Sequence, residues 1–211
     1  MTAIVDYGVG NLFSLSCSLS YIGEEAKITG DRREIIAADR IILPGVGAFG
    51  DAAGKLTSTG LGEAVREAAR AGKPLLGICL GMQLLFEYSE EFGRHEGLGL
   101  LRGHVVPVSL RPGFDARLKI PHIGWNPLII MPGKPLLKYT SDGDCVYFVH
   151  SYCAVGCDES LAAVTEYSVP LTAAVQKDNI CGCQFHPEKS GNTGLDILRA
   201  FCGKDRGARQ C

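Results

Sequence analysis

The chain is predicted to be an α/β protein whose mixed, largely parallel open sheet is flanked by helices. In its first half, short and almost continuously apolar strands alternate with amphipathic helices, which is typical of parallel strands covered on both faces. In its second half, strands follow one another through short links, which favours antiparallel pairing. A length of 211 residues suits one domain, and no repeat or interdomain linker divides the chain.

The first half contains three predicted strands and two predicted helices. The strands are apolar runs over residues 3–5, 40–43 and 74–78. The helices cover residues 11–22 and 61–71, each with apolar side chains in phase on one face. A further helix is expected to begin at Met82, directly after the third strand.

The second half contains five predicted strands and a closing helix. The strands cover residues 105–109, 145–149, 162–165, 171–176 and 180–185, and the helix covers 192–202. Asp178 and Asn179 are predicted to form a tight turn between the last two strands. We therefore expect one domain over residues 1–203 and a disordered tail over 204–211.

Composition excludes several classes of protein. The net charge of −2 and the absence of a basic block argue against a nucleic-acid or membrane-surface protein. The N-terminus lacks the features of a secretory signal, and no window approaches the ~20 apolar residues of a membrane span, so a cytoplasmic protein is expected. Nine cysteines in a chain of this kind are expected to be free thiols. Cys181 and Cys183 lack a second ligand pair, so we expect them in the core and predict neither a metal nor a cofactor.

The segment Gly-Ile-Cys-Leu-Gly at 77–81 places Cys79 between two glycines where a strand meets a helix. The glycines permit a tight reversal that pushes the central side chain out at the carboxyl end of the sheet. A thiol at a helix N-terminus is favoured as the reactive thiolate. Cys79 is therefore a candidate nucleophile; on this segment alone, a buried structural cysteine is an equally good interpretation.

A cysteine nucleophile needs a base, and that base needs an orienting group. Among five histidines, His186 is the strongest candidate because it follows a predicted strand in the sequence Phe-His-Pro-Glu. Glu188, two residues later, projects from the same side of an extended chain and can accept the imidazole N–H. The alternative is a surface histidine beside a glutamate. His150 has no adjacent acid and is expected to shape the pocket.

The glycine-rich segment 44–50 follows the second predicted strand of the sheet. Its backbone N–H groups, together with that of Leu80, can form an oxyanion hole. A phosphate-binding loop is the competing interpretation, but the Lys-Ser/Thr pair of a Walker motif is missing. Gly8 and Gly10 likewise form only part of a dinucleotide fingerprint, because Phe13 stands where its third glycine belongs.

Two of these motifs together resemble those of the class I (triad) glutamine amidotransferases: Gly-Ile-Cys-Leu-Gly-Met-Gln at 77–83 and Phe-His-Pro-Glu at 185–188. Four further segments, at 6–11, 44–47, 121–126 and 150–152, are similar to the glutaminase subunits of imidazole glycerol phosphate synthases. The likeness runs from Asp6 to about Phe201. It implies a flavodoxin-like, three-layer arrangement of the predicted sheet and helices.

The resemblance also implies roles for individual residues. Cys79 is the nucleophile, His186 the base and Glu188 its orienting group. The oxyanion is met by N–H groups from Leu80 and from the region of Val46 and Gly47, the latter after a peptide flip. The remaining implied residues fall into two groups: a glutamine pocket of Gly47, Gln83, Glu91, Ser151 and Tyr152, and a partner interface of Pro121, His122, Trp125, Asn126 and Lys189.

The implied reaction is hydrolysis of the side-chain amide of glutamine, with ammonia passed to a partner. That partner is a cyclase subunit of (β/α)₈-barrel type, so a heterodimer is expected. The cyclase adds the ammonia to a phosphoribosyl-carboxamide nucleotide, which gives imidazole glycerol phosphate and aminoimidazole carboxamide ribonucleotide in histidine biosynthesis. Three alternatives stay open: a glutaminase of the anthranilate, vitamin B6 or purine pathway, an inactive binding module, and a stand-alone cysteine hydrolase of γ-glutamyl compounds.

Overall fold

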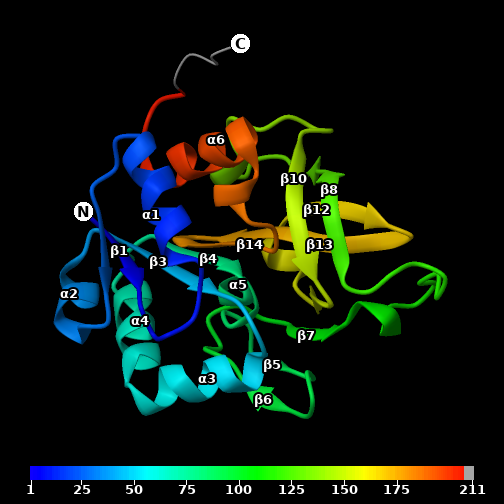
Figure 1. Ribbon diagram of the computed structural model, residues 1–211, viewed down its shortest axis with the longest axis horizontal. Coiled ribbons are helices and arrows are strands. Elements are labelled where there is room, and N and C mark those ends of the chain that lie inside the picture. The colour runs from blue at the N-terminus through cyan, green and yellow to red at the C-terminus, as the bar shows by residue number, and fades with distance from the viewer. Residues whose placement is uncertain (207–211) are drawn as a thin grey trace.

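The computed structural model describes residues 1–206, and its centre is a twisted sheet of eight strands (Figure 1). The strand order is β2-β1-β3-β4-β14-β13-β12-β9. The first five strands are parallel and the last three are added antiparallel, so the predicted mixed, largely parallel sheet is confirmed. In chain order the strands are β1 (Thr2–Val5), β2 (Ala26–Thr29), β3 (Arg40–Gly45), β4 (Leu75–Cys79), β9 (Ile129–Ile130), β12 (Leu161–Tyr167), β13 (Val169–Lys177) and β14 (Ile180–Cys183).

Helices cover both faces of this sheet, as Figure 1 shows. One face carries α1 (Leu12–Tyr21) and α6 (Gly191–Cys202), whose apolar side chains share a core with Ile42 and Leu76 of the strands. The opposite face carries α2 (Arg32–Ala37), α3 (Phe49–Ser58) and α4 (Leu61–Arg70). Their core includes Ile41 and Leu75, which are next in sequence to Ile42 and Leu76 and point to the opposite face of the sheet. This alternation explains why the strands are apolar throughout.

Two smaller sheets stand beside the large one. A hairpin-like pair consists of β8 (His122–Pro127) and β10 (Cys145–His150), and its Val146 and Phe148 join the core on the α6 side. The other small sheet has the order β11-β7-β5-β6 and joins the core on the α4 side through Val105 and Ala154. Its strands are β5 (Tyr88–Ser89), β6 (His95–Glu96), β7 (His104–Pro107) and β11 (Tyr152–Val155).

Strongly periodic segments of the sequence fold as predicted, including helices α1, α4 and α6 and the turn at Asp178, which has a φ of 51°. The expected helix after Cys79 is different. It is the single turn α5 (Leu80–Gln83), because the carbonyls of residues 84–86 accept hydrogen bonds from backbone N–H groups of residues 98–101 instead of continuing the helix. Helix α3 was not predicted, since its glycine-containing first turn lies in the segment interpreted as a loop.

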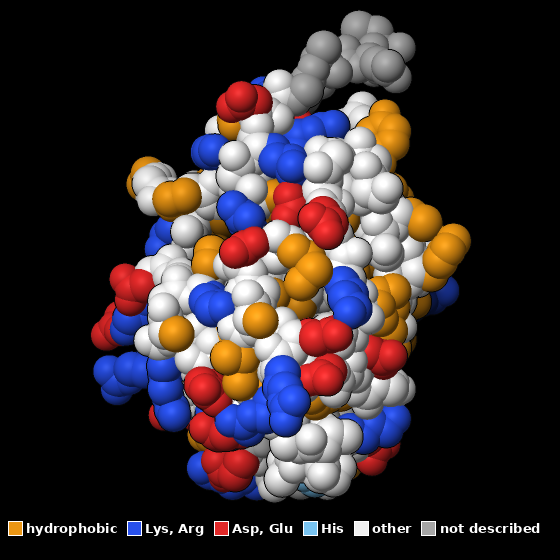
Figure 2. Space-filling view, turned by 90° about the vertical axis from the view of Figure 1, so that its left-hand side faces the viewer, with side chains coloured by type: hydrophobic (Ala, Val, Ile, Leu, Met, Phe, Trp, Pro, Cys, Tyr) orange, Lys and Arg blue, Asp and Glu red, His pale blue; other side chains and the backbone are white. Residues whose placement is uncertain are grey.

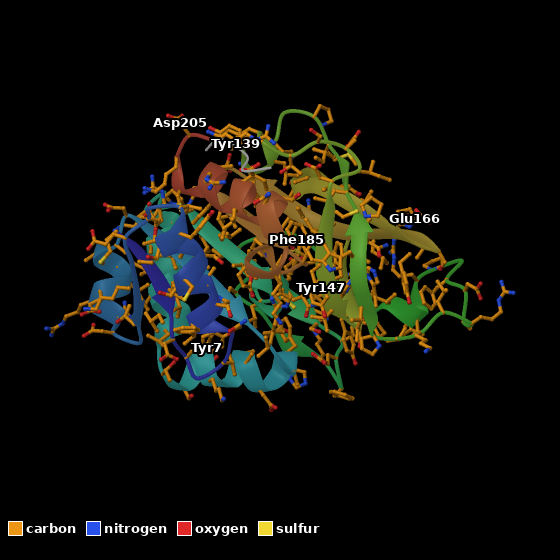
Figure 3. All side chains as sticks on the ribbon, turned by 45° about the horizontal axis from the view of Figure 1, so that its top comes forward. Tyr7, Tyr139, Tyr147, Glu166, Phe185 and Asp205 are labelled. Carbon is orange, nitrogen blue, oxygen red and sulfur yellow. The ribbon has the colours of Figure 1, made fainter. Side chains whose placement is uncertain are left out.

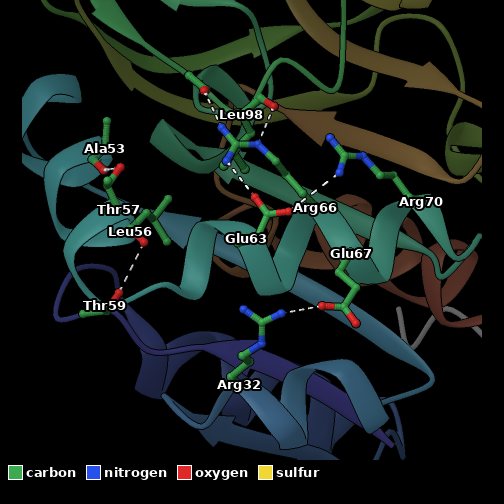
Figure 4. Close-up of polar contacts among 11 residues, drawn as sticks. Arg32, Ala53, Leu56, Thr57, Thr59, Glu63, Arg66, Glu67, Arg70 and Leu98 are labelled. Atoms are coloured by element: carbon green, nitrogen blue, oxygen red, sulfur yellow. Dashed lines mark hydrogen bonds and ion pairs between the residues drawn. The ribbon is translucent and has the colours of Figure 1, made fainter.

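Helix α4 is tied to its surroundings by charged side chains (Figure 4). Glu67 forms an ion pair with Arg32 at the start of α2, and Arg66 donates to the backbone carbonyls of Gly97 and Leu98. On the face shown in Figure 2, basic and acidic side chains are intermingled. Such exposed pairs each contribute little to stability, about 0 to 1 kcal/mol, so the two cores dominate it.

Part of the C-terminal segment expected to be a disordered tail is anchored. Lys204 Nζ donates to the carbonyl of Gly23 at 2.7 Å, and Arg206 Nε donates to Asp196 Oδ2 at 3.0 Å. Residues 207–211 of that expected tail lie outside the described residues. No helix within residues 1–206 is both long enough and apolar enough to cross a membrane.

Gly81 is the position in the fold where a side chain is least acceptable. A Cβ there would lie 1.8 Å from the carbonyl oxygen of Leu43, so α5 could no longer pack against β3. We expect Gly81→Ala to lower the free energy of unfolding by about 3 kcal/mol or more, measured by denaturant titration. Gly54→Ala is the matched control: its Cβ would meet open space within α3, so we expect a gain of up to about 1 kcal/mol. Equal unfolding midpoints for Gly81→Ala and wild type would contradict this expectation.

Candidate active site

The sheet topology brings the predicted catalytic residues to one edge. Strands β3, β4 and β14 are parallel neighbours, so their carboxyl ends lie side by side. Cys79 is the last residue of β4, Gly45 is the last residue of β3, and His186 follows β14 by three residues. Residues that are about 100 positions apart in the chain therefore meet at the carboxyl edge of the sheet, where α/β proteins place their sites.

Cys79 occupies a sharp turn between β4 and α5. Its φ of 54° and ψ of −112° lie in a region that non-glycine residues rarely adopt. The turn is held by close packing around its two glycines, because a Cβ on Gly77 would lie 2.6 Å from the carbonyl oxygen of Gly81. Cys79 is 8% exposed and borders the cavity described below. The structure therefore has the strained turn that the sequence predicts at this position.

His186 and Glu188 form a buried pair beside the thiol. His186 Nδ1 lies 2.8 Å from Glu188 Oε1; because the carboxylate only accepts, Nδ1–H is the donor. The other ring nitrogen is left for Cys79, which ends the neighbouring strand β4 and borders the same cavity as His186. Burial lowers the pKa of His186, but the interactions with Cys79 and Glu188 outweigh burial and raise that pKa to about 9. The environment therefore favours an imidazolium beside the sulfur.

A buried amide network that the sequence reasoning missed supports the thiol from its other side. Gln184 Nε2 lies 3.8 Å from Cys79 Sγ, and Gln184 Oε1 accepts from Gln83 Nε2 at 3.0 Å. Gln83 Nε2 also donates to the carbonyl of Tyr152 at 3.2 Å. The signal available in the sequence was a glutamine directly before Phe185 and His186, at the end of an apolar strand. Both amides are buried, so this network fixes Gln83 at the cavity wall.

A cavity of about 360 Å³ opens in front of Cys79. This volume is in the range that binds small metabolites. Its walls come from the ends of β3, β4 and β10, from the β5–β6 region and from the turn after β14. The lining residues are Val46, Gly47, Cys79, Leu80, Gln83, Glu91, Pro121, Val149, His150, Ser151, Tyr152, His186 and Lys189.

Glu91 was the member of the expected glutamine pocket with the weakest sequence signal, since it ends an acidic run. Its side chain is buried and faces the cavity. Oε2 accepts a 2.6 Å hydrogen bond from the backbone N–H of Phe49, at the first turn of α3. Burial raises the pKa of Glu91, although the Phe49 N–H and His95 oppose that change. Glu91 therefore places a carboxyl group at the cavity wall, where a ligand cation would favour its charged form.

The expected oxyanion residues lie together at the cavity wall. Leu80 begins α5, and Val46 and Gly47 follow the end of β3. Gly47 has a φ of 94°, which glycine adopts readily and other residues do not. Val46 is 42% exposed. Beyond the buried Gly45, the loop is therefore free of the packing that would fix its peptide orientation.

The expected interface residues divide between two faces of the β8–β10 pair. Trp125 is 54% exposed and its ring lies edge-on to Tyr147, over which Lys189 Nζ also lies at 5.8 Å. Pro121 is exposed at the cavity rim. By contrast, His122 is only 1% exposed and points inward, so it offers no surface to a partner. Asn126 shares that inward face, where its Nδ2 donates to the carbonyl of Glu166.

His122 forms a buried pair with His150 behind the cavity wall. His150 Nδ1 must donate to the carbonyl of Tyr152 at 2.8 Å, so its Nε2 accepts from His122 Nδ1–H at 3.0 Å. Burial lowers the pKa of both rings, that of His150 to about 4, so both are neutral near pH 7. The pair therefore braces the Ser151–Tyr152 segment, and His150 shapes the pocket as expected.

Cys181 and Cys183 point into the core below α6, as predicted for small apolar residues. Within residues 1–206, no group of three or more His, Cys, Asp or Glu side chains is placed to hold a metal ion. Gly8 and Gly10, the partial fingerprint, lie in the β1–α1 loop, where Gly10 packs near Pro44.

Comparison with known proteins agrees with this geometry. The family model for glutamine amidotransferase class-I matches residues 3–204. An imidazole glycerol phosphate synthase subunit HisH from Caldanaerobacter subterraneus is 52% identical over 202 residues, covering 95% of this chain and 97% of its own length. The HisH subunits of Wolinella succinogenes and Lactococcus lactis are 47% and 49% identical, over 96% and 94% of this chain and 98% and 96% of their own.

Solved structures show the same fold at much lower sequence identity. A glutamine amidotransferase superposes with a TM-score of 0.74 at 18% identity, over 95% of this chain and 97% of its own. PurLQS from Thermotoga maritima gives a TM-score of 0.70 at 21% identity, over 96% and 97%. From the family model and the HisH relatives, which match nearly the whole chain, it follows that the chain belongs to the class-I glutamine amidotransferases and, within them, to the imidazole glycerol phosphate synthase subunits HisH.

Proposed function

We propose that this glutaminase subunit hydrolyses glutamine through Cys79, His186 and Glu188 and passes the ammonia to a cyclase subunit in histidine biosynthesis. The observation that carries this proposal is the buried His186–Glu188 hydrogen bond beside Cys79, with His186 and Cys79 lining one cavity of about 360 Å³. A nucleophile, a base and an orienting carboxylate in that order are the groups that acyl transfer requires.

The first half of the reaction forms a thioester. The Cys79 thiolate attacks the amide carbon of glutamine, a C–S bond forms, and the carbonyl electron pair becomes an oxyanion. That oxyanion is met by N–H groups of Leu80 and of the Val46–Gly47 loop. His186 then donates its Nε2 proton to the amide nitrogen, the C–N bond breaks, and ammonia leaves.

The second half returns the enzyme to its starting state. Neutral His186 takes a proton from water, whose oxygen attacks the thioester carbon. The C–S bond breaks, glutamate is released, and the sulfur leaves as a thiolate beside the imidazolium. Glu188 keeps the Nδ1 proton in place throughout, so His186 always presents Nε2 to the reacting atoms.

Glutamine has a zwitterionic end that needs its own contacts. The buried Glu91 carboxylate suits the α-ammonium group of the substrate, and Gln83 and the Ser151–Tyr152 segment supply further polar groups to the same cavity. Gly47 borders the same cavity and leaves room for the substrate side chain to reach Cys79.

The partner is a cyclase subunit of (β/α)₈-barrel type that docks over the cavity rim. Pro121 is exposed at that rim and Lys189 lies beside Tyr147. The exposed Trp125 forms an aromatic pair with Tyr147 on the outer face of β8–β10. Tryptophan is enriched among the residues that dominate binding energy at interfaces. His122 and Asn126 support this face from behind.

The test follows the amide nitrogen of glutamine in four mixtures. Glutamine labelled at that nitrogen is incubated with this glutaminase alone, with the cyclase alone, with both, and with both plus the nucleotide substrate. We expect labelled nucleotide product only in the last mixture, and a glutaminase rate that rises when the cyclase binds. Equal rates of ammonia release with and without the cyclase would contradict the partner role and indicate a stand-alone hydrolase.

A further inference from the structure

A buried tyrosine hydroxyl lies beside the oxyanion loop and has no part in the reaction described above. Tyr7 follows β1, the parallel neighbour of β3, so its side chain reaches the carboxyl end of β3. Its ring is 4% exposed and belongs to the core on the α4 side of the sheet. Its Oη–H donates to the carbonyl oxygen of Pro44 at 2.8 Å.

The residue after Pro44 is held on two sides. A Cβ on Gly45 would lie 2.8 Å from Tyr7 Oη, and 2.9 Å from both Leu80 Cβ and Gly81 N. Gly45 is therefore enclosed between the tyrosine hydroxyl and the start of α5. In the β3–β4 register, Gly45 is also the direct partner of Cys79. The hydroxyl thus acts on the strand end that lies next to the nucleophile.

The loop changes from buried to exposed immediately after Gly45. Pro44 and Gly45 are buried, whereas Val46 and Gly47 are exposed and border the cavity. Gly47 has a φ of 94°, which glycine adopts readily, and nothing lies within 4 Å of its ideal Cβ position, so no close neighbour encloses it there as Gly45 is enclosed. The Tyr7–Pro44 hydrogen bond is therefore positioned as a restraint on the stem of a loop whose tip is free.

We propose that Tyr7 is a positioning residue, whose hydroxyl fixes Pro44 and Gly45 so that the N–H groups of Val46 and Gly47 face the oxyanion formed at Cys79. This inference rests on the proposed function of those residues. Burial, together with the charge of Cys79, raises the pKa of the Tyr7 hydroxyl, so it keeps its proton and stays a donor across the working pH range. A rotation of the loop is then confined to Val46 and Gly47.

The test compares Tyr7→Phe with wild type in the complex with the cyclase and its nucleotide. We expect kcat for glutamine hydrolysis to fall by about tenfold or more, since the oxyanion donors lose their fixed stem. We expect KM for glutamine to stay within about threefold, because the hydrogen bonds that hold Glu91 and Gln83 at the cavity wall do not involve Tyr7. The rate of Cys79 alkylation by iodoacetamide should not change, since it reports the thiolate and His186 alone.

Tyr139→Phe is the matched control. Its hydroxyl also donates to a backbone carbonyl, that of Lys204 at 3.2 Å, and Figure 3 shows it at the opposite end of the molecule from Tyr7. Tyr139→Phe should keep wild-type kcat and KM. If Tyr7→Phe also keeps wild-type kcat, or if KM and kcat/KM change while kcat does not, the positioning role is overturned. A fall in the alkylation rate likewise overturns it, because Tyr7 then acts on the thiol.

Two unnatural residues separate the hydrogen bond from the packing of the ring, and thermal unfolding confirms that each variant is folded. Tyr7→4-aminophenylalanine restores an N–H donor and should recover most of the lost kcat. Tyr7→4-methylphenylalanine fills the same space without a donor and should behave like Tyr7→Phe; equal rates for the two would overturn the inference. Cys79→Ala in the same assay separates the two proposals, since its activity bears on the nucleophile and not on Tyr7.

Discussion

Replacing Cys79 with alanine is expected to lower the glutamine-dependent rate by at least about 10⁴-fold, to the level of the assay background. The thiolate forms the only covalent bond to substrate in the proposed mechanism, and no other thiol borders the cavity among the described residues. The binding groups of the cavity are untouched, so glutamine should still bind. The measurement is ammonia release from glutamine in the complex with the cyclase.

Two controls show that the loss is specific. Product formation from added ammonium salt should continue with Cys79→Ala, because the cyclase then needs no glutaminase. Cys181 is buried in the core on the α6 side, in β14, the strand next to the one that ends at Cys79. Cys181→Ala should leave kcat unchanged and lower the free energy of unfolding slightly. Ammonia release at wild-type rate by Cys79→Ala would show that the nucleophile is another residue.

The parts of the fold that the sequence predicts are those determined by local pattern. Leu12, Leu15 and Leu19 repeat at helical spacing and form α1, and the apolar run before Cys79 forms the central strand. Gly77 and Gly81 predict the turn at the nucleophile, and the structure gives the reason. A Cβ on Gly81 would collide with the carbonyl oxygen of Leu43, and a Cβ on Gly77 would collide with that of Gly81. The spacing of His186 and Glu188 likewise predicts their pairing, although Glu188 lies in a 3₁₀ turn (Pro187–Lys189) and not in the extended chain that was expected.

The parts that it does not predict depend on contacts between distant segments. Glu91 belongs to an acidic run that is typical of a solvated helix end; it is buried because the first turn of α3 supplies the Phe49 N–H. Helix α5 stops after Gln83 because residues 98–101 take its next carbonyls. His122 was expected at the interface, yet the pleat of β8 turns it toward His150 and Tyr167. Periodicity carries no information on such pairings.

Glu188→Gln is expected to lower kcat by about a thousandfold while leaving the fold intact. Glutamine is isosteric, and its Oε1 can still accept from His186 Nδ1, so the geometry is kept and the charge is removed. Glu188 Oε1 is the one oxygen paired with His186, and Oε2 is buried with no hydrogen-bond partner among the described residues. The negative charge therefore acts almost wholly on the imidazolium that forms during both halves of the reaction. The measurement is kcat for glutamine at fixed pH in the complex.

The same variant should change how stability depends on pH. The folded-state pKa of His186 is raised from 6.5 to about 9. The protonated ring therefore adds to the free energy of unfolding, fully below pH 6.5, and this addition is lost as the pH rises through about 9. In wild type, the free energy of unfolding should therefore fall by up to about 3 kcal/mol across that window. Glu188→Gln removes one of the interactions that raise this pKa. The fall in its free energy of unfolding should therefore be smaller than that of wild type and complete at lower pH. If both proteins lose stability equally over the window, the carboxylate does not hold the proton on His186, and orientation alone accounts for its role.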